Sequence, residues 1–160
     1  MKSFALALLA VTLVAADKPT PRQKARELLD SAAEMIAATK PDVQAVALMH
    51  LADNYQVFDK KKAIEYFKQA FTAASLPPTG QSPFARNAQT EIVVALATLD
   101  TAEGVGLLKQ IEPRTQGYDI RTFAASRVIG VLLQKNQMQP AIDLAESMGS
   151  CKILSCNSLE

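Results

Sequence analysis

Helix-start signals divide the chain into segments of helical length. Thr or Ser followed by proline, or a lone Asp, precedes several runs in which apolar residues recur three and four positions apart. Such side chains cap the free N–H groups of a first helical turn, and proline suits the first helical position. No segment alternates apolar and polar residues convincingly, as a half-buried strand would. We therefore expect about seven helices, near residues 20–39, 42–57, 59–75, 83–99, 100–111, 119–135 and 140–149.

Composition agrees with an all-α fold in one domain. The chain has 160 residues, of which 49% are hydrophobic and 6% aromatic, and it contains no Trp. Sheets are enriched in β-branched and aromatic residues, so this balance favours close-packed helices. The chain has 17 Lys and Arg residues and 16 Asp and Glu residues, so it is nearly neutral. A near-neutral chain is a poor candidate for nucleic-acid binding, which usually requires a basic excess.

The first sixteen residues have the pattern of a secretory signal peptide. Lys2 precedes an apolar run from Phe4 to Val14, and Ala15-Ala16 supplies a small-residue cleavage site. The run is too short to span a bilayer comfortably. We expect cleavage after residue 16, no stable membrane span in the mature chain, and a periplasmic or secreted location. The alternative is an uncleaved anchor or a buried helix.

An internal repeat runs through the helical part. Pairs of matching residues lie 39 positions apart in the predicted helices: Ala63, Ala102 and Ala141; Phe84-Ala85 and Phe123-Ala124; Val93-Val94 and Leu132-Leu133. The segment "KARELL" near residue 24 also matches "KAIEYF" near residue 62. This predicts stacked antiparallel helical hairpins over residues 17–150, with 20–39 as a second helix that lacks its first, and a tail at 151–160.

The pair from Val43 to Ser75 resembles a tetratricopeptide-type repeat. The resemblance is carried by Leu51-Ala52, Tyr55, Ala63, Phe67 and Ala70. The later pairs keep only the small and bulky apolar positions, and their period exceeds the usual 34. A HEAT-like or irregular α-solenoid is the alternative.

The resemblance implies that the first helices line a concave groove that binds peptide segments. Its positions in this chain would be Met49, Asp53, Gln56, Arg127 and Gln134. The alternative is that these are ordinary surface residues.

Residues that could carry chemistry are few. His50 is the single histidine, and Asp53 lies three positions later, so one helix face could hold both. No nucleophile motif or Gly-rich phosphate loop accompanies them. One His and two Cys are too few for an ordinary zinc site. We expect no catalysis, no metal and no cofactor.

Cys151 and Cys156 are the only cysteines. In an oxidising compartment they are candidates for a local disulfide, which would need a turn because residues five apart on a helix do not face each other. Two free or intermolecular thiols are the alternative.

A lysine triplet, Lys60 to Lys62, opens the helix near residues 59–75. Phe67 and Phe71 belong to the apolar stripe of that helix, so they are not available to stack on bases. Cations in a first turn oppose the helix dipole slightly, so helix stability does not explain the triplet.

These observations together predict an exported helical scaffold that binds a protein or peptide partner without catalysis. The uncovered helix at 20–39 also suggests a homodimer, or a fragment of a longer repeat array. The rival function is a small periplasmic enzyme, or an enzyme accessory, with a site near His50 and Asp53.

Overall fold

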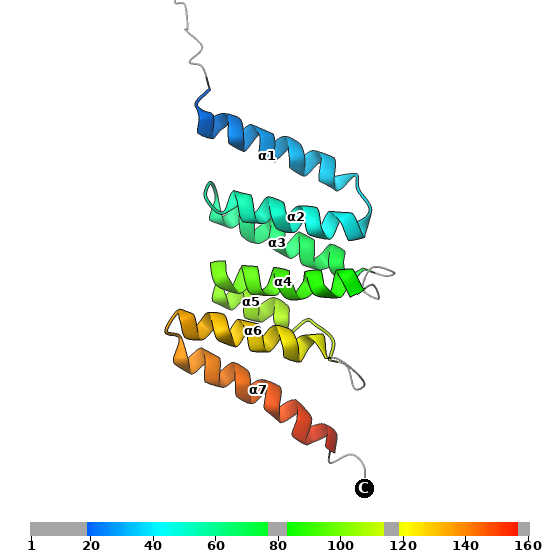
Figure 1. Cartoon of the computed structure of the whole chain (residues 1–160), viewed down its shortest axis with the longest axis vertical. Helices are drawn as coiled ribbons and strands as arrows, with labels where there is room; N and C mark the ends of the chain where they lie inside the picture. Colours follow the sequence, from blue (N-terminus) through cyan, green and yellow to red (C-terminus); the bar gives the residue numbers. More distant parts are fainter. Residues whose placement is uncertain (1–18, 77–82, 114–118, 157–160) are drawn as a thin grey trace, which may run out of the picture.

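A computed structural model of the chain describes residues 19–76, 83–113 and 119–156 (Figure 1). The described residues form seven helices and no strand, which confirms the predicted all-α class and helix number. In chain order they are α1 Pro21–Ala37, α2 Pro41–Tyr55, α3 Lys60–Ser75, α4 Pro83–Leu99, α5 Thr101–Leu108, α6 Ile120–Gln134 and α7 Met138–Cys156.

Side-chain caps fix most of the helix starts. Thr20 forms a reciprocal capping box with Gln23, and Asp59, Asp100 and Asp119 each accept hydrogen bonds from backbone N–H groups of the turn that follows.

Several helix boundaries differ from the prediction. The helix α2 begins at Pro41 with Lys40 as its N-cap, so Asp42, where the sequence predicts the start, lies inside the helix. Proline at the first helical position starts this helix one residue early. The helix α7 runs from Met138 to Cys156, beyond the expected end at Gly149. Pro140 falls in its first turn, where a missing N–H costs little.

The helices follow one another along the long axis of the molecule (Figure 1). In that view α2, α4 and α6 lie toward the viewer, and α3 and α5 lie behind them. Each helix packs against the next, and α4 also packs against α2 and α6. One apolar core runs through α2 to α7, and its largest fully buried side chains are Tyr55, Phe67, Ile92, Leu96, Leu108, Val93, Val128 and Leu132.

Buried residues on successive helices recur at spacings other than the predicted 39. Ala63, Phe67 and Ala70 are buried on α3, and the buried residues 41 positions later are Gly104, Leu108 and Ile111. Ala102, which the 39-residue spacing matched to Ala63, is exposed. The next step is shorter: Ala88, Ile92 and Leu96 of α4 correspond to Ala124, Val128 and Leu132 of α6, 36 positions later. The predicted spacing of 39 therefore lies between the two spacings, 41 and 36, at which buried residues recur.

Candidate binding face

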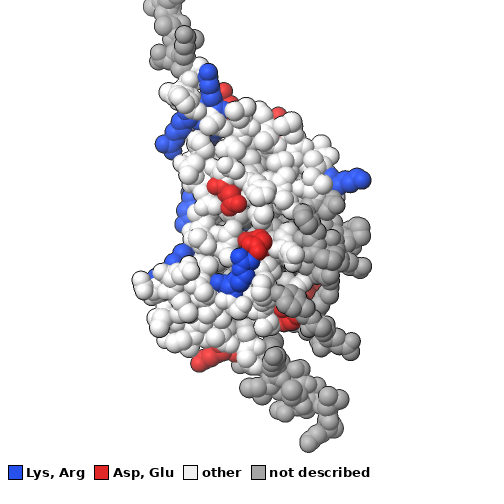
Figure 2. All heavy atoms as spheres, viewed as in Figure 1, with Lys and Arg blue, Asp and Glu red and all other residues white. Residues whose placement is uncertain are grey.

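Exposed and half-buried residues on α4 and α6 share one side of the molecule. On α4 they are Asn87, Glu91, Val94 and Thr98, and on α6 they are Phe123, Arg127, Gly130 and Gln134. Each set is spaced i, i+4, i+7 and i+11, which places its members on one helix face. Together with Met49, His50 and Asp53 of α2, these residues are called the front face. Figure 2 shows the side on which α2, α4 and α6 lie, and it carries few charged side chains.

An ion pair joins α4 to α6 on the front face. Arg127 directs Nη1 to Oε1 of Glu91, and its Nη2 donates to Oε2 of Glu91 at 3.0 Å. Two parallel N–H···O bonds fix the relative position of two planar groups more tightly than one bond does. The guanidinium predicted to line a groove is therefore engaged within the molecule.

Glu91 was not singled out from the sequence. The signal that could have found it is its position 36 residues before Arg127, the spacing that relates the buried residues of α4 and α6. His50 lies 41 residues before Glu91, so His50 rather than Met49 occupies the corresponding position on α2. His50 is exposed, whereas Met49 is half-buried and packs against the core.

The predicted groove residues of α2 form a small polar group. The Gln56 side-chain amide donates to Oδ1 of Asp53 at 3.2 Å. Desolvation raises the pKa of the Asp53 carboxyl, while His50 and the Gln56 hydrogen bond oppose that rise. Because α4 lies between α2 and α6, this group is separated from Arg127 and from exposed Gln134. The common groove stays a prediction.

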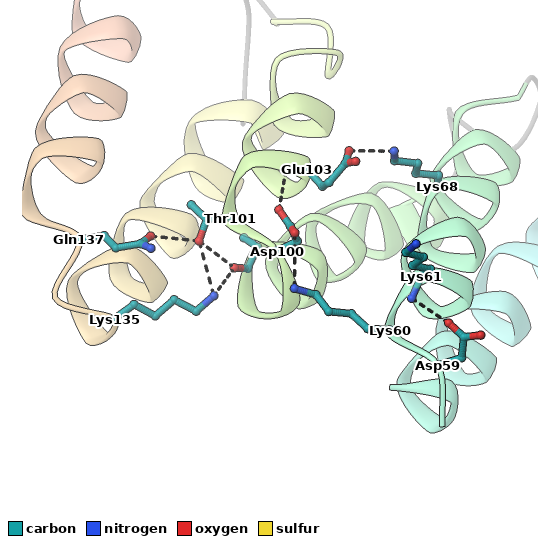
Figure 3. Close-up of polar contacts among 10 residues, drawn as sticks. Asp59, Lys60, Lys61, Lys68, Asp100, Thr101, Glu103, Lys135 and Gln137 are labelled. Carbon is teal, nitrogen blue, oxygen red and sulfur yellow. Dashed lines mark hydrogen bonds and ion pairs between the residues drawn. The ribbon is translucent and has the colours of Figure 1, made fainter. Parts of the chain in front are cut away.

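The lysines of α3 have partners on two other helices. Lys62 Nζ lies 2.6 Å from Asp30 Oδ1 on α1, and Lys60 Nζ lies 3.5 Å from Asp100 Oδ2 at the start of α5. Lys68, further along α3, pairs with Glu103 at 2.8 Å (Figure 3). Two of the three lysines in the triplet therefore connect α3 to neighbouring helices. These contacts account for cations that do not stabilise α3 itself.

Asp30 is shared between Lys62 and Tyr55, whose hydroxyl also donates to Oδ1 of Asp30. The Lys62 and Tyr55 hydrogen bonds lower the pKa of Asp30, and the bond to Asp30 raises the pKa of Lys62 to about 12. Burial, and then the Asp30 hydrogen bond, raises the pKa of Tyr55, so its hydroxyl stays a donor at neutral pH. This polar cluster attaches α1 to α2 and α3.

Two predicted features fall wholly or partly outside what the structure describes. The signal segment at residues 1–16 lies outside the described residues. Only the backbone is described at Cys151 and Cys156, where it continues as α7. The disulfide therefore stays a prediction, and it would require the chain to leave the helical path.

No described helix is long and apolar enough to cross a bilayer. Within the described residues, no group of three His, Cys, Asp or Glu could hold a metal ion.

Comparison of the chain with protein-family models, curated proteins and solved structures finds no match. The front face and the contacts beneath it are therefore the features from which a function can be inferred.

Proposed function

We propose that the protein is an exported, tetratricopeptide-like helical scaffold that binds a protein or peptide segment on its front face, without catalysis. The observation that carries this proposal is that most of that face is uncharged in Figure 2, and that Glu91 and Arg127 on it pair with each other. The centres of protein interfaces are depleted of charged residues and enriched in aromatic ones. Phe123 fits that pattern, because 43% of its surface is exposed on the front face.

Rigidity beneath the face supports the same proposal. The Glu91–Arg127 pair holds α4 and α6 in one relative position, and the core continues under α2, α4 and α6. A partner that docks on a preformed surface loses less binding free energy to ordering of the receptor. We infer that the scaffold presents its contacts without rearrangement.

Photo-crosslinking from single positions tests the proposal. A photoreactive residue replaces Phe123 on the front face, and the same residue replaces exposed Gln69 on α3 as the matched control. We expect one defined protein adduct in the native cell envelope from position 123 and not from position 69. Equal adducts from both positions, or none from position 123, would contradict binding on the front face.

A charge introduced into the face provides a second test. Thr98→Glu adds a carboxylate to exposed Thr98 of α4, and Gln69→Glu adds one to α3. Thr98→Glu should weaken capture of the crosslinked partner about tenfold, because a desolvated charge without a partner is costly in an interface. Gln69→Glu should leave capture unchanged.

Export and the absence of catalysis are tested by separate measurements. Sequencing of the N-terminus of the protein from the cell envelope should begin at Asp17. A mature chain that retains Met1 would contradict signal cleavage. The enzyme alternative would gain support if His50→Ala removed a measurable turnover while the protein stayed folded.

A further inference from the structure

A hollow of about 470 Å³ lies between α5 and α7, away from the front-face residues. One wall is formed by Thr101, Ala102, Val105 and Lys109 of α5. The other wall is formed by Gln137, Pro140, Asp143, Leu144 and Ser147 at the start and along α7. Its volume falls in the range of sites that hold small ligands, about 300–1,000 Å³.

At one end of the hollow, α5 contacts the residue that precedes α7. The hydroxyl of Thr101 lies 3.0 Å from Gln137 Oε1, and beside it Lys135, at the end of α6, donates from Nζ to the Ala97 carbonyl of α4 at 2.8 Å (Figure 3). Beyond these contacts the two walls are linked through α6, against which both helices pack. The corresponding seam between α3 and α5 is instead bridged at both Lys60 and Lys68.

The lining is apolar between two opposite charges. Val105, Ala102, Pro140 and Leu144 provide the apolar surface. Lys109 lies on the α5 wall and Asp143 on the α7 wall, and neither forms an ion pair with another described residue. The Gln139 amide donates to Oδ1 of Asp143 at 2.7 Å, which leaves Oδ2 for another donor.

We propose that this hollow binds a short apolar peptide in its zwitterionic form. The side chains of the peptide lie on the apolar lining, its terminal carboxylate lies against Lys109, and its terminal ammonium lies against Asp143. Charge complementarity favours this occupant, because a ligand with one charge would leave the exposed group on the opposite wall unpaired. The hollow and the front face share no residue, so the two proposals can fail independently.

Titration of the purified chain with the dipeptide Leu-Leu tests the proposal. We expect saturable binding by calorimetry. N-acetyl-Leu-Leu and Leu-Leu-amide each lack one terminal charge and should bind about two- to fivefold more weakly, the effect typical of one exposed ion pair. Lys109→Gln should abolish the preference for the free carboxylate alone, and Asp143→Asn the preference for the free ammonium alone.

Matched variants separate the hollow from the rest of the surface. Ala102→Phe fills the hollow from an exposed position and should remove binding, while Ala145→Phe, at an exposed position of α7 outside the lining, should retain it. Lys61→Gln controls for loss of a surface lysine. The proposal is overturned if Leu-Leu shows no saturable binding, if Ala102→Phe binds as the unmodified chain does, or if both blocked peptides bind as tightly as Leu-Leu.

Discussion

At the scale of single residues, two glycines of α5 illustrate what the sequence can and cannot predict. From its residue type alone, each of Gly104 and Gly106 could either weaken this helix or permit close approach of a neighbour. A Cβ at Gly104 would lie 2.5 Å from the Ala97 backbone of α4, whereas a Cβ at Gly106 would meet nothing within 4 Å. The two roles depend on which side of α5 faces α4, and that is set by the packing of distant residues.

Gly104→Ala should therefore destabilise the protein. A methyl group would force α4 and α5 apart, at a cost of about 1–3 kcal/mol that exceeds the gain of roughly 1 kcal/mol in helix propensity. Urea unfolding followed by circular dichroism measures the difference in free energy of unfolding. Gly106→Ala is the control and should stabilise the protein by up to about 1 kcal/mol, since it changes propensity alone. Equal effects of the two substitutions would disprove the close approach.

At the scale of elements, the sequence was most informative where helix formation is local. The caps at Asp59, Asp100 and Asp119 act within one turn, so the residue pattern alone identified them. Contacts between helices could not be predicted from such local residue patterns. The Asp30–Lys62 and Glu91–Arg127 pairs join residues more than thirty positions apart, and their partners depend on unequal repeat steps.

The helix α1 is the element whose attachment depends most on polar contacts. It contains no buried residue. Lys62 and Tyr55 hold Asp30, and Arg22 Nη2 donates to the Val57 carbonyl at 3.1 Å. Asp30→Asn should accelerate hydrogen exchange of the α1 amides about two- to fivefold at neutral pH, because a neutral amide is a weaker partner for Lys62.

The pH dependence of α1 attachment follows from the same carboxylate. Because the pKa of Asp30 is lowered in the folded chain, its stabilising contribution is complete above the ordinary value of 3.8 and is lost as pH falls through the lowered value. The contribution of Lys62 is complete below 10.5 and is lost as pH rises through about 12. Protection of the α1 amides, measured against the intrinsic exchange rate at each pH, should therefore fall in acid in the unmodified chain and change less in Asp30→Asn. Lys60→Met, which breaks the pair to Asp100, is the control and should leave α1 exchange unchanged.

At the scale of the whole molecule, the all-α class and the number of helices were predictable because each helix carries its own periodicity and breaks. The front face was predictable only in part. Arg127 and Gln134 do lie on it, but the regular spacing pointed to Met49 where the unequal steps point to His50. A single averaged period cannot resolve a shift of one residue, and one residue moves a side chain by roughly 100° around a helix.

The α1 end of the described residues leads to a prediction about assembly. Leu28 and Met35 lie seven positions apart on α1 and are 72% and 69% exposed. Two such faces can cover each other around a two-fold axis, because a self-complementary patch closes as a dimer. We predict a concentration-dependent dimer in sedimentation velocity, and Leu28→Lys should abolish it by placing a charge in the contact. Met138→Lys changes an equally apolar residue, 62% exposed, at the opposite end of the stack, and should leave the dimer intact. A chain that sediments as a monomer at all concentrations, or a dimer lost only in Met138→Lys, would show that α1 is not the interface.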